Sequence, residues 1–266
     1  CYIRDVTSRE FWSTAYQPTL KRSRHFEAIF SEGRAEFRSR DHDYETHTEI
    51  AVSPEDDIEL RRVRITNRGR TRRSLDVTSY AEVVLASPAA DALHPAFSNL
   101  FVQTEILRPQ QAILCTRRPR SQSEQAPWML HQMAVHGVQT GEVSYEADRM
   151  QFIGRGRTIV DPQAMNAPAA LSGSEGSVLD PIVAIRCRIT LDPEESATIN
   201  MVSGIAETRA AALRLVEKYQ DRRLADRVFD LAWTHGQVLL RQLNLSEADA
   251  QLYGHLAGAV IYANTW

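Results

Sequence analysis

The sequence predicts a mostly β fold, a large antiparallel β-sandwich over residues 1–204, followed by helices over residues 205–266. Three observations lead to this prediction. Apolar and polar residues alternate along several stretches of the first two thirds of the chain, as in strands with one buried face. Turn-forming residues separate these stretches, for example at 53–57. After Gly204 the apolar period changes from two to the spacing of a helix.

The clearest predicted strand runs from Leu75 to Leu85, where the odd positions are apolar or small and most of the even positions are polar. Further strands are predicted at 26–30, 45–52, 58–65, 183–191 and 197–201. Between Leu60 and Val63 the apolar residues change from even to odd positions. This change indicates either a β-bulge or a strand with two buried faces.

Three helices are predicted in the last part of the chain. The first carries an apolar stripe that includes Leu213 and Val216, and Asp221 is predicted to cap the second. Ser246 and Asp249 have the Ser-x-x-Asp spacing of a capping box, which predicts the start of the third. Strands followed by helices indicate an α+β arrangement or two successive units.

Residues 87–95 and 165–176 lack a clear period and are predicted to be long loops. Loops are where β proteins commonly place ligand contacts. Aromatic and arginine side chains beside such loops are candidates for sugar binding, because sugar rings stack on aromatic faces and hydroxyls bond to charged side chains. Taken one at a time, aromatic residues are more often part of a core.

The composition excludes several classes of protein. A formal net charge of −3 argues against a nucleic-acid partner, which would favour a basic face. The three cysteines are far apart and odd in number, so neither a disulfide framework nor a metal site is predicted from them. No apolar run reaches the roughly 20 residues of a membrane span. Because the chain begins at Cys1 and ends within an apolar run, we expect it to be a piece of a longer protein.

Motifs for catalysis are weak. Asp41–Asp43 together with His47 and Glu49 could suggest a metal site, but His42 is expected on the opposite face of a strand from His47. An exposed polar face is therefore favoured, and no metal is predicted. Gly154–Gly156 lacks the strand–loop–helix context of a phosphate-binding loop. No nucleophile constellation is apparent, so no catalytic residue is predicted.

Several short segments do carry a family resemblance. They are Tyr2–Asp5, Phe11–Ser13, Ile50–Asp57, Val77–Leu85, His94–Ser98, Asp148–Arg149, Phe152–Arg155 and Leu179–Pro181. As a set they resemble the N-terminal sandwich of the family 94 glycoside phosphorylases, such as cellobiose and chitobiose phosphorylase. They are most similar to the version inside bacterial cyclic β-1,2-glucan synthases. The resemblance extends over nearly the whole chain.

The resemblance implies a galactose mutarotase-like sandwich that a helical linker, residues 205–266, joins to an (α/α)6 barrel. In that family the catalytic acid is an Asp of the barrel and inorganic phosphate is the nucleophile. We therefore expect no catalytic residue and no cofactor in this chain, with phosphate as a co-substrate of the parent enzyme. The expected partners are a β-glucan or glucooligosaccharide, the barrel of the same chain and a second copy in a homodimer. The expected location is the cytoplasmic face, as a soluble part of an inner-membrane protein.

The motif match also implies which residues bind the sugar. Arg149 is expected to donate to sugar hydroxyls, with Asp148 orienting it. The chain has Gly154–Arg155–Gly156–Arg157 where the simple phosphorylases usually carry an aromatic residue. The full predicted substrate-binding set is Asp148, Arg149, Phe152, Gly154, Arg155, Trp12, His94 and Phe97. The predicted function is a non-catalytic sandwich that binds or positions β-glucan for a separate catalytic barrel.

Two other functions stay open. One is a stand-alone mutarotase-like sugar epimerase, which needs a His acid and a carboxylate base on opposite sides of the reacting ring. The segment His94–Leu100 is similar to the His motif of those enzymes, but the sequence offers no second well-placed His, and three C-terminal helices are foreign to them. The other is a purely structural or dimerisation module without a sugar contact of its own.

Overall fold

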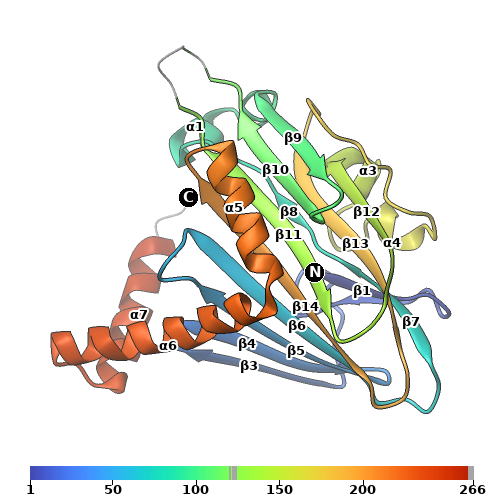
Figure 1. The fold of residues 1–266 in the computed structure, drawn as a ribbon, viewed down its shortest axis with the longest axis horizontal. Coiled ribbons are helices and arrows are strands. Elements are labelled where there is room, and N and C mark those ends of the chain that lie inside the picture. Colours follow the sequence, from blue (N-terminus) through green and yellow to red (C-terminus); the bar gives the residue numbers. More distant parts are fainter. Residues whose placement is uncertain (120, 122–124, 263–266) are drawn as a thin grey trace.

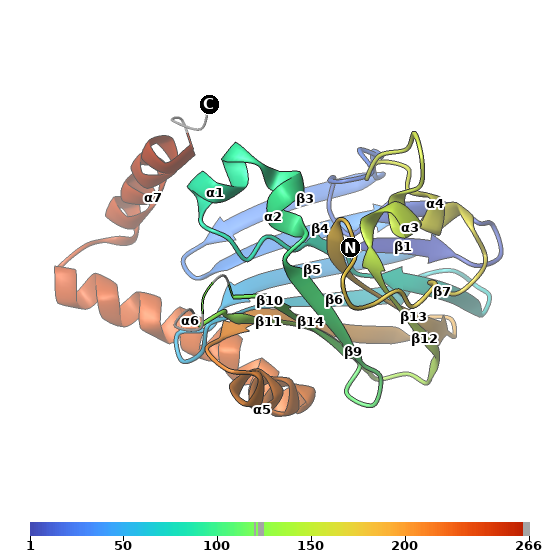
Figure 2. The same cartoon turned by 90° about the horizontal axis from the view of Figure 1, so that it is seen from above.

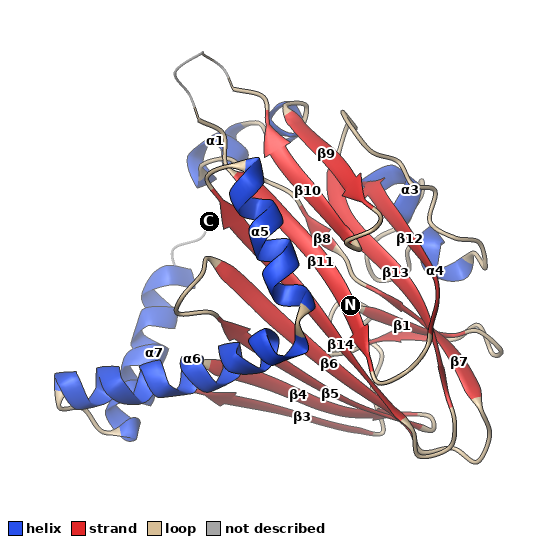
Figure 3. Cartoon of the chain, viewed as in Figure 1, coloured by secondary structure: helices blue, strands red, loops and turns tan. Residues whose placement is uncertain are grey.

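The computed structural model describes residues 1–119, 121 and 125–262, and two antiparallel β-sheets packed face to face make up most of it (Figures 1 and 3). The small sheet has the order β12 (Thr140–Asp148), β13 (Pro181–Leu191), β7 (Arg73–Thr78), β1 (Tyr2–Asp5) and β2 (Phe11–Ser13), with β8 (Ala81–Glu82) paired to β13. The large sheet has the order β3 (His25–Ser31), β4 (Arg34–Asp41), β5 (Tyr44–Val52), β6 (Ile58–Asn67), β14 (Ser196–Ala206), β11 (Trp128–His136), β10 (Ala112–Arg117) and β9 (Val102–Leu107). The predicted antiparallel sandwich is thereby confirmed.

The central strands of the large sheet are buried on both faces, and β6 shows how. Its odd residues Val63 and Ile65 lie in the core between the two sheets. Its even residues Ile58 and Leu60 lie in a second core, between the sheet and the C-terminal helices. The pairing of β6 with β5 and β14 runs without interruption, so the change of parity at 60–63 reflects two buried faces and no bulge.

The C-terminal helices are α5 (Arg209–Gln220), α6 (Arg222–Leu243) and α7 (Glu247–Tyr262). The expected caps are present: the Asp221 carboxylate accepts the Arg223 N–H at 2.8 Å, and the Ser246 hydroxyl donates to Asp249 at 2.6 Å. Helices α5 and α6 cover the outer face of the large sheet, whereas α7 buries none of its described residues (Figure 2). Residues 263–266 of the predicted linker lie outside the described residues.

The first predicted loop is largely helical. Residues 88–93 form α1 (Pro88–Leu93), and α2 (Pro95–Asn99) follows directly. Ser87 accepts the Ala90 N–H, and a proline occupies the first turn of each helix, where a missing N–H costs no hydrogen bond. Figure 2 places these helices on the opposite side of the sandwich from α5.

The second predicted loop follows α3 (Arg149–Ile153) and α4 (Gln163–Asn166) and packs on the outer face of the small sheet. Two buried arginines, Arg4 and Arg186, fasten it by donating to its backbone carbonyls. Asp76, which is buried beneath them, pairs with Arg4 at 2.5 Å and with Arg188 at 2.8 Å. Among the described residues, no helix is long and apolar enough to cross a membrane.

Candidate functional site

Within the predicted sugar-binding segment, residues 149–153 form a short, firmly anchored helix, α3. Asp148, at the end of β12, caps α3 by accepting the Met150 N–H at 2.8 Å. Phe152 anchors the helix, because its ring is 0% exposed and packs against Tyr80 with ring centroids 5.0 Å apart. Gly154 ends the helix with a φ of +85°, a conformation that favours glycine. The motif therefore fixes the direction in which the Arg149 side chain projects from the first turn of α3.

Arg149 meets two carboxylates at the end of the small sheet. Its Nε lies 3.2 Å from Glu82 Oε1, and its Nη1 lies 3.5 Å from Asp180 Oδ2. The Tyr80 hydroxyl donates to Glu82 Oε1 at 3.0 Å, and Asn99 Nδ2 donates to Asp180 Oδ1 at 3.0 Å. We call these five residues the carboxylate ledge. They come from four separate parts of the chain, and only Arg149 belongs to the predicted set.

The ledge is accessible and polar. The Arg149 side chain is 36% exposed, and those of Glu82 and Asp180 are at least as open. Partial burial raises the pKa of the Asp180 carboxyl by more than the Arg149 charge lowers it. The ledge thus combines a planar cation with two carboxylates and a phenol, so it can both donate to and accept from neighbouring hydroxyl groups.

Helix α2, which is bonded to the ledge through Asn99, also carries an exposed aromatic side chain. The bond from Asn99 ties the end of α2 to Asp180, and buried Arg117 holds the same helix by donating to the Ser98 carbonyl and hydroxyl at 3.1 and 3.0 Å. Phe97, on this helix, is 59% exposed and rests edge-on against Phe101. His94, between α1 and α2, is exposed as well.

The other predicted residues fall into two groups: those in or next to α3, and Trp12 in the core between the sheets. Asp148, Arg149, Gly154 and Phe152 belong to the α3 unit, and Arg155 is exposed just beyond it. Trp12 is only 3% exposed and stacks on Tyr44 in the inter-sheet core, away from the ledge. Phe152 and Trp12 therefore offer no free ring face to a ligand in this structure. These two rings can therefore contribute to a sugar site only indirectly, by packing against the residues around them.

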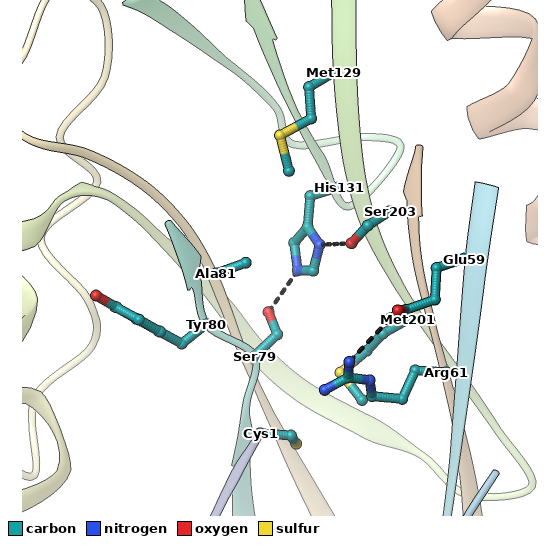
Figure 4. Close-up of a pocket in the computed structure, with 10 residues that line it drawn as sticks. All are labelled: Cys1, Glu59, Arg61, Ser79, Tyr80, Ala81, Met129, His131, Met201 and Ser203. Carbon is teal, nitrogen blue, oxygen red and sulfur yellow. Dashed lines mark hydrogen bonds and ion pairs between the residues drawn. The ribbon is translucent and has the colours of Figure 1, made fainter. Parts of the chain in front are cut away.

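A cavity of about 280 Å³ lies between the two sheets, beside the ledge. The extended segment 79–82 lies between the two features: Ser79 and Ala81 line the cavity, Glu82 belongs to the ledge, and Tyr80 belongs to both. The large sheet contributes Glu59 and Arg61 from β6, Met201 and Ser203 from β14, and Met129 and His131 from β11. Figure 4 shows His131 pointing between two serines and Tyr80 turned away.

His131 is the central polar group of this cavity. Its Nδ1 lies 2.8 Å from Ser203 Oγ and its Nε2 lies 2.8 Å from Ser79 Oγ. Burial, assisted by the charge of Arg61, lowers the pKa of His131 to about 4. The ring is therefore neutral near pH 7, with one nitrogen donating and the other accepting. Glu59 and Arg61, two residues apart on one strand, form an ion pair of 2.9 Å in the same cavity.

Sequence reasoning did not single out this cavity, although a signal was present. Along β6, β14 and β11 the inward-facing residues change from apolar to polar toward one end of the sandwich. Each strand supplies only one or two polar residues, so the pattern becomes visible only when the strands are aligned in register.

One further group of possible ligands lies on the outer face of β4 and β5. Glu36, His47 and Glu49 bring three ligand atoms within 4.8 Å of one another. Each of these side chains already has a partner: His47 Nε2 lies 2.9 Å from Glu36, and Arg34 lies 2.7 Å from Glu49. The face is polar, as favoured from the sequence, but these three side chains are partly buried and not exposed; because each is already paired, we assign no metal to it.

The two packed antiparallel sheets, with helices against the outer face of the larger one, define the class of supersandwich domains. The chain belongs to one family of this class, the glycosyl hydrolase 94 supersandwich domain, whose family model matches residues 1–222. The predicted family is thereby confirmed.

Two relatives and one solved structure illustrate the similarity. The chain is 30% identical over 261 residues to the cyclic β-(1,2)-glucan synthase NdvB of Rhizobium meliloti (strain 1021), covering 98% of this chain and 9% of that protein. It is 23% identical over 217 residues to solabiose phosphorylase of Paenibacillus borealis, covering 82% of this chain and 27% of that protein. A heparan sulfate lyase structure from Pedobacter heparinus aligns with a TM-score of 0.41 at 8% identity, covering 71% of this chain and 22% of that one. The chain thus spans a small part of the length of its curated relatives.

Proposed function

We propose that this chain is a non-catalytic, sugar-positioning domain that binds β-glucan at the carboxylate ledge. It would hold the glucan for a separate (α/α)6 barrel of the same protein. That barrel would supply the catalytic acid and use inorganic phosphate as co-substrate. The observation that carries the proposal is the arrangement of Arg149 between Glu82 and Asp180, with the exposed ring of Phe97 on the helix that Asn99 joins to Asp180.

The chemistry of the ledge suits an uncharged polyol. One guanidinium between two carboxylates leaves an excess of negative charge, which disfavours anionic ligands. Vicinal hydroxyls can accept from the guanidinium and donate to the carboxylates, and charge-assisted hydrogen bonds of this kind are the stronger ones. An exposed phenyl face adds a surface on which the C–H side of a sugar ring can stack.

Membership of the family and the names of the two relatives support a glucan as the ligand. One of these relatives is named a cyclic β-(1,2)-glucan synthase and the other a phosphorylase of a disaccharide. We further propose that the parent protein places this domain on the cytoplasmic face of the inner membrane, and that a second copy of the domain pairs with it.

The test is a calorimetric titration of linear β-1,2-glucooligosaccharides into the chain and into two variants. Arg149→Ala removes the central donor. Arg209→Ala is the matched control, because Arg209 is also partly exposed and ion-paired, to Glu105, but lies on α5 across the molecule. We expect saturable binding that Arg149→Ala weakens about tenfold or more and that the control leaves unchanged. Absence of binding, or equal affinity in both variants, would overturn the proposal.

A second candidate function, sugar epimerisation, has one observation in its favour. The structure puts His131 and Glu59 in the same cavity, so a histidine and a carboxylate are available together, although His94 is not the histidine involved. Against it, both nitrogens of His131 are already bonded to serines, and its low pKa keeps the ring uncharged near pH 7, where it is a poor general acid. A polarimetric assay with freshly dissolved α-glucose decides: acceleration of mutarotation that Glu59→Gln abolishes would favour the epimerase.

A further inference from the structure

We infer that the cavity around Ser79, His131 and Ser203 is a second sugar subsite, separate from the ledge, that takes one uncharged hexose ring. This inference rests on the proposed function, which it deepens by naming a single sugar unit as the ligand of a particular cavity. Four features of the described residues lead to it: the polar row, an unused hydroxyl proton, the apolar wall and the internally paired charges.

The first feature is a row of polar residues where a packing core needs none. Rows of residues in register across β6, β14 and β11 face the small sheet, and they change in character toward the cavity. From the core outward these rows are Val63–Ile199–Val135, Arg61–Met201–Met133 and Glu59–Ser203–His131. Burying polar groups costs free energy unless their hydrogen bonds are satisfied, so a polar row at a cavity is expected where a ligand completes those bonds.

The second feature is a hydroxyl proton that the hydrogen bonds between the described residues leave unused. Ser79 Oγ accepts the Ile185 N–H at 3.0 Å. Its own proton has two acceptors within reach, and we assign it to His131 Nε2 at 2.8 Å because the Ile185 carbonyl is farther away, at 3.4 Å. With Nε2 accepting, the neutral ring carries its proton on Nδ1 and donates it to Ser203 Oγ. The Ser203 proton is then left over, and in the described part of the chain no acceptor for it is seen. A sugar hydroxyl in the cavity would accept this proton.

The third feature is the apolar part of the wall. Met129, Met201 and Ala81 line the cavity beside the polar row. A pyranose ring is amphipathic in the same way, with C–H groups on its faces and hydroxyls around its edge. Methionine side chains adapt well to such a surface, because they are flexible and polarizable.

The fourth feature fixes the charge and size of the ligand. Glu59 and Arg61 neutralise each other at 2.9 Å, and their side chains are 42% and 37% exposed. Burial lowers the pKa of the amino group of Cys1, which also lines the cavity, to about 5, so near pH 7 the cavity offers hydrogen-bonding groups without a net charge. This favours an uncharged ligand over a phosphate or a uronate. A volume of about 280 Å³ lies just below the usual range for ligand pockets, roughly 300–1,000 Å³, which suits one sugar ring and excludes a chain of them.

The five methionines of the chain make a direct test possible by methyl NMR. Met129 and Met201 line the cavity, Met150 is exposed on α3 next to Arg149 of the ledge, and Met165 is buried elsewhere. The chain would be labelled at the methionine methyl groups, assigned with single Met→Leu variants and titrated with methyl β-D-glucopyranoside. We expect saturable changes in the methyl chemical shifts of Met129 and Met201, and no change in that of Met165.

Two variants identify the cavity as the origin of these shifts. Ser203→Val removes the hydroxyl and adds bulk on a strand that tolerates β-branched residues, and we expect it to weaken monosaccharide binding about tenfold. Arg149→Ala should leave this binding unchanged. If Ser203→Val fails to fold, as the Met165 methyl position would reveal, Glu59→Gln at the partly exposed mouth takes its place with the same expected result.

The outcomes separate this inference from the proposed function. Absence of any shift at Met129 and Met201 up to the solubility limit of the glucoside, or shifts that survive the cavity variant, would overturn the cavity subsite. Shifts at Met150 alone, sensitive to Arg149→Ala, would overturn it too while supporting the ledge. Shifts at the cavity methyls alone, with Met150 silent even toward β-1,2-glucooligosaccharides, would support the cavity and count against the ledge.

Discussion

Replacing Phe152 with alanine is expected to lower stability strongly, because the ring is the anchor of the α3 unit. The side chain is 0% exposed, and its ring packs against Tyr80 at 5.0 Å and Tyr2 at 5.9 Å between ring centroids. Truncations of buried phenylalanines cost about 3–5 kcal/mol, as the sum of lost transfer free energy and a new cavity. We expect Phe152→Ala to fall in this range, since a helix held at both ends by Asp148 and Gly154 has little freedom to close the gap.

The measurement is urea unfolding followed by circular dichroism at neutral pH. Met150→Ala is the control: Met150 is 50% exposed on the same helix, so its truncation should change the free energy of unfolding by no more than about 0.5 kcal/mol. Sugar affinity would be measured on both variants without denaturant. If Phe152→Ala unfolds at the same urea concentration as the original chain and loses sugar affinity, the reasoning is refuted, because the ring would then act by touching the ligand.

Three further predictions follow from buried or strained positions. Asp76→Asn should cost about 3–5 kcal/mol in thermal unfolding, since it leaves buried Arg4 without its counter-charge; an unchanged melting temperature would contradict this. Gly154→Ala should destabilise more than Gly156→Ala: both have positive φ, but a Cβ at 154 would lie 2.6 Å from a side-chain oxygen of α4, while one at 156 meets nothing within 4 Å. The third concerns pH. Because folding lowers the pKa of His131 from 6.5 to about 4, the unfolded chain binds the proton first, and stability should fall as pH drops through this window. The loss in the free energy of unfolding approaches about 3 kcal/mol once the pH is below the folded-state pKa of His131. His131→Gln should flatten this part of the stability–pH curve.

The main elements of the fold could be predicted from the sequence because their signals are local. Alternation along 75–85 indicated one strand; the structure confirms it as far as Thr78 (β7), then interrupts it and adds only the short β8 at Ala81–Glu82. The capping residues Asp221 and Ser246 indicated where helices begin. The strand signal at 58–65 was ambiguous because its apolar residues change parity. Only the tertiary packing of helices on the outer face decides that both faces are buried. The helix α1 was missed because it is short, buries no residue and so has no apolar period.

The candidate site was predicted only in part, for a related reason. The Asp148–Arg149 motif was recognisable as a segment, and the structure places Arg149 at an accessible surface. Its partners Glu82 and Asp180 are 67 and 31 positions away, and no local pattern connects them to it. Trp12 was selected for its residue type, but whether a ring faces a core or a ligand depends on what the other sheet covers.

The short segment 79–82 imposes a constraint on any redesign of this domain. Successive side chains of an extended chain point to opposite faces, so this stretch supplies the cavity with Ser79 and Ala81 and the ledge with Glu82 and the Tyr80 hydroxyl, while the body of Tyr80 also lines the cavity. Inserting or deleting one residue here would exchange the two sets and disable both surfaces at once. The specificities of cavity and ledge can be altered one side chain at a time, but the backbone that carries them must be transplanted whole.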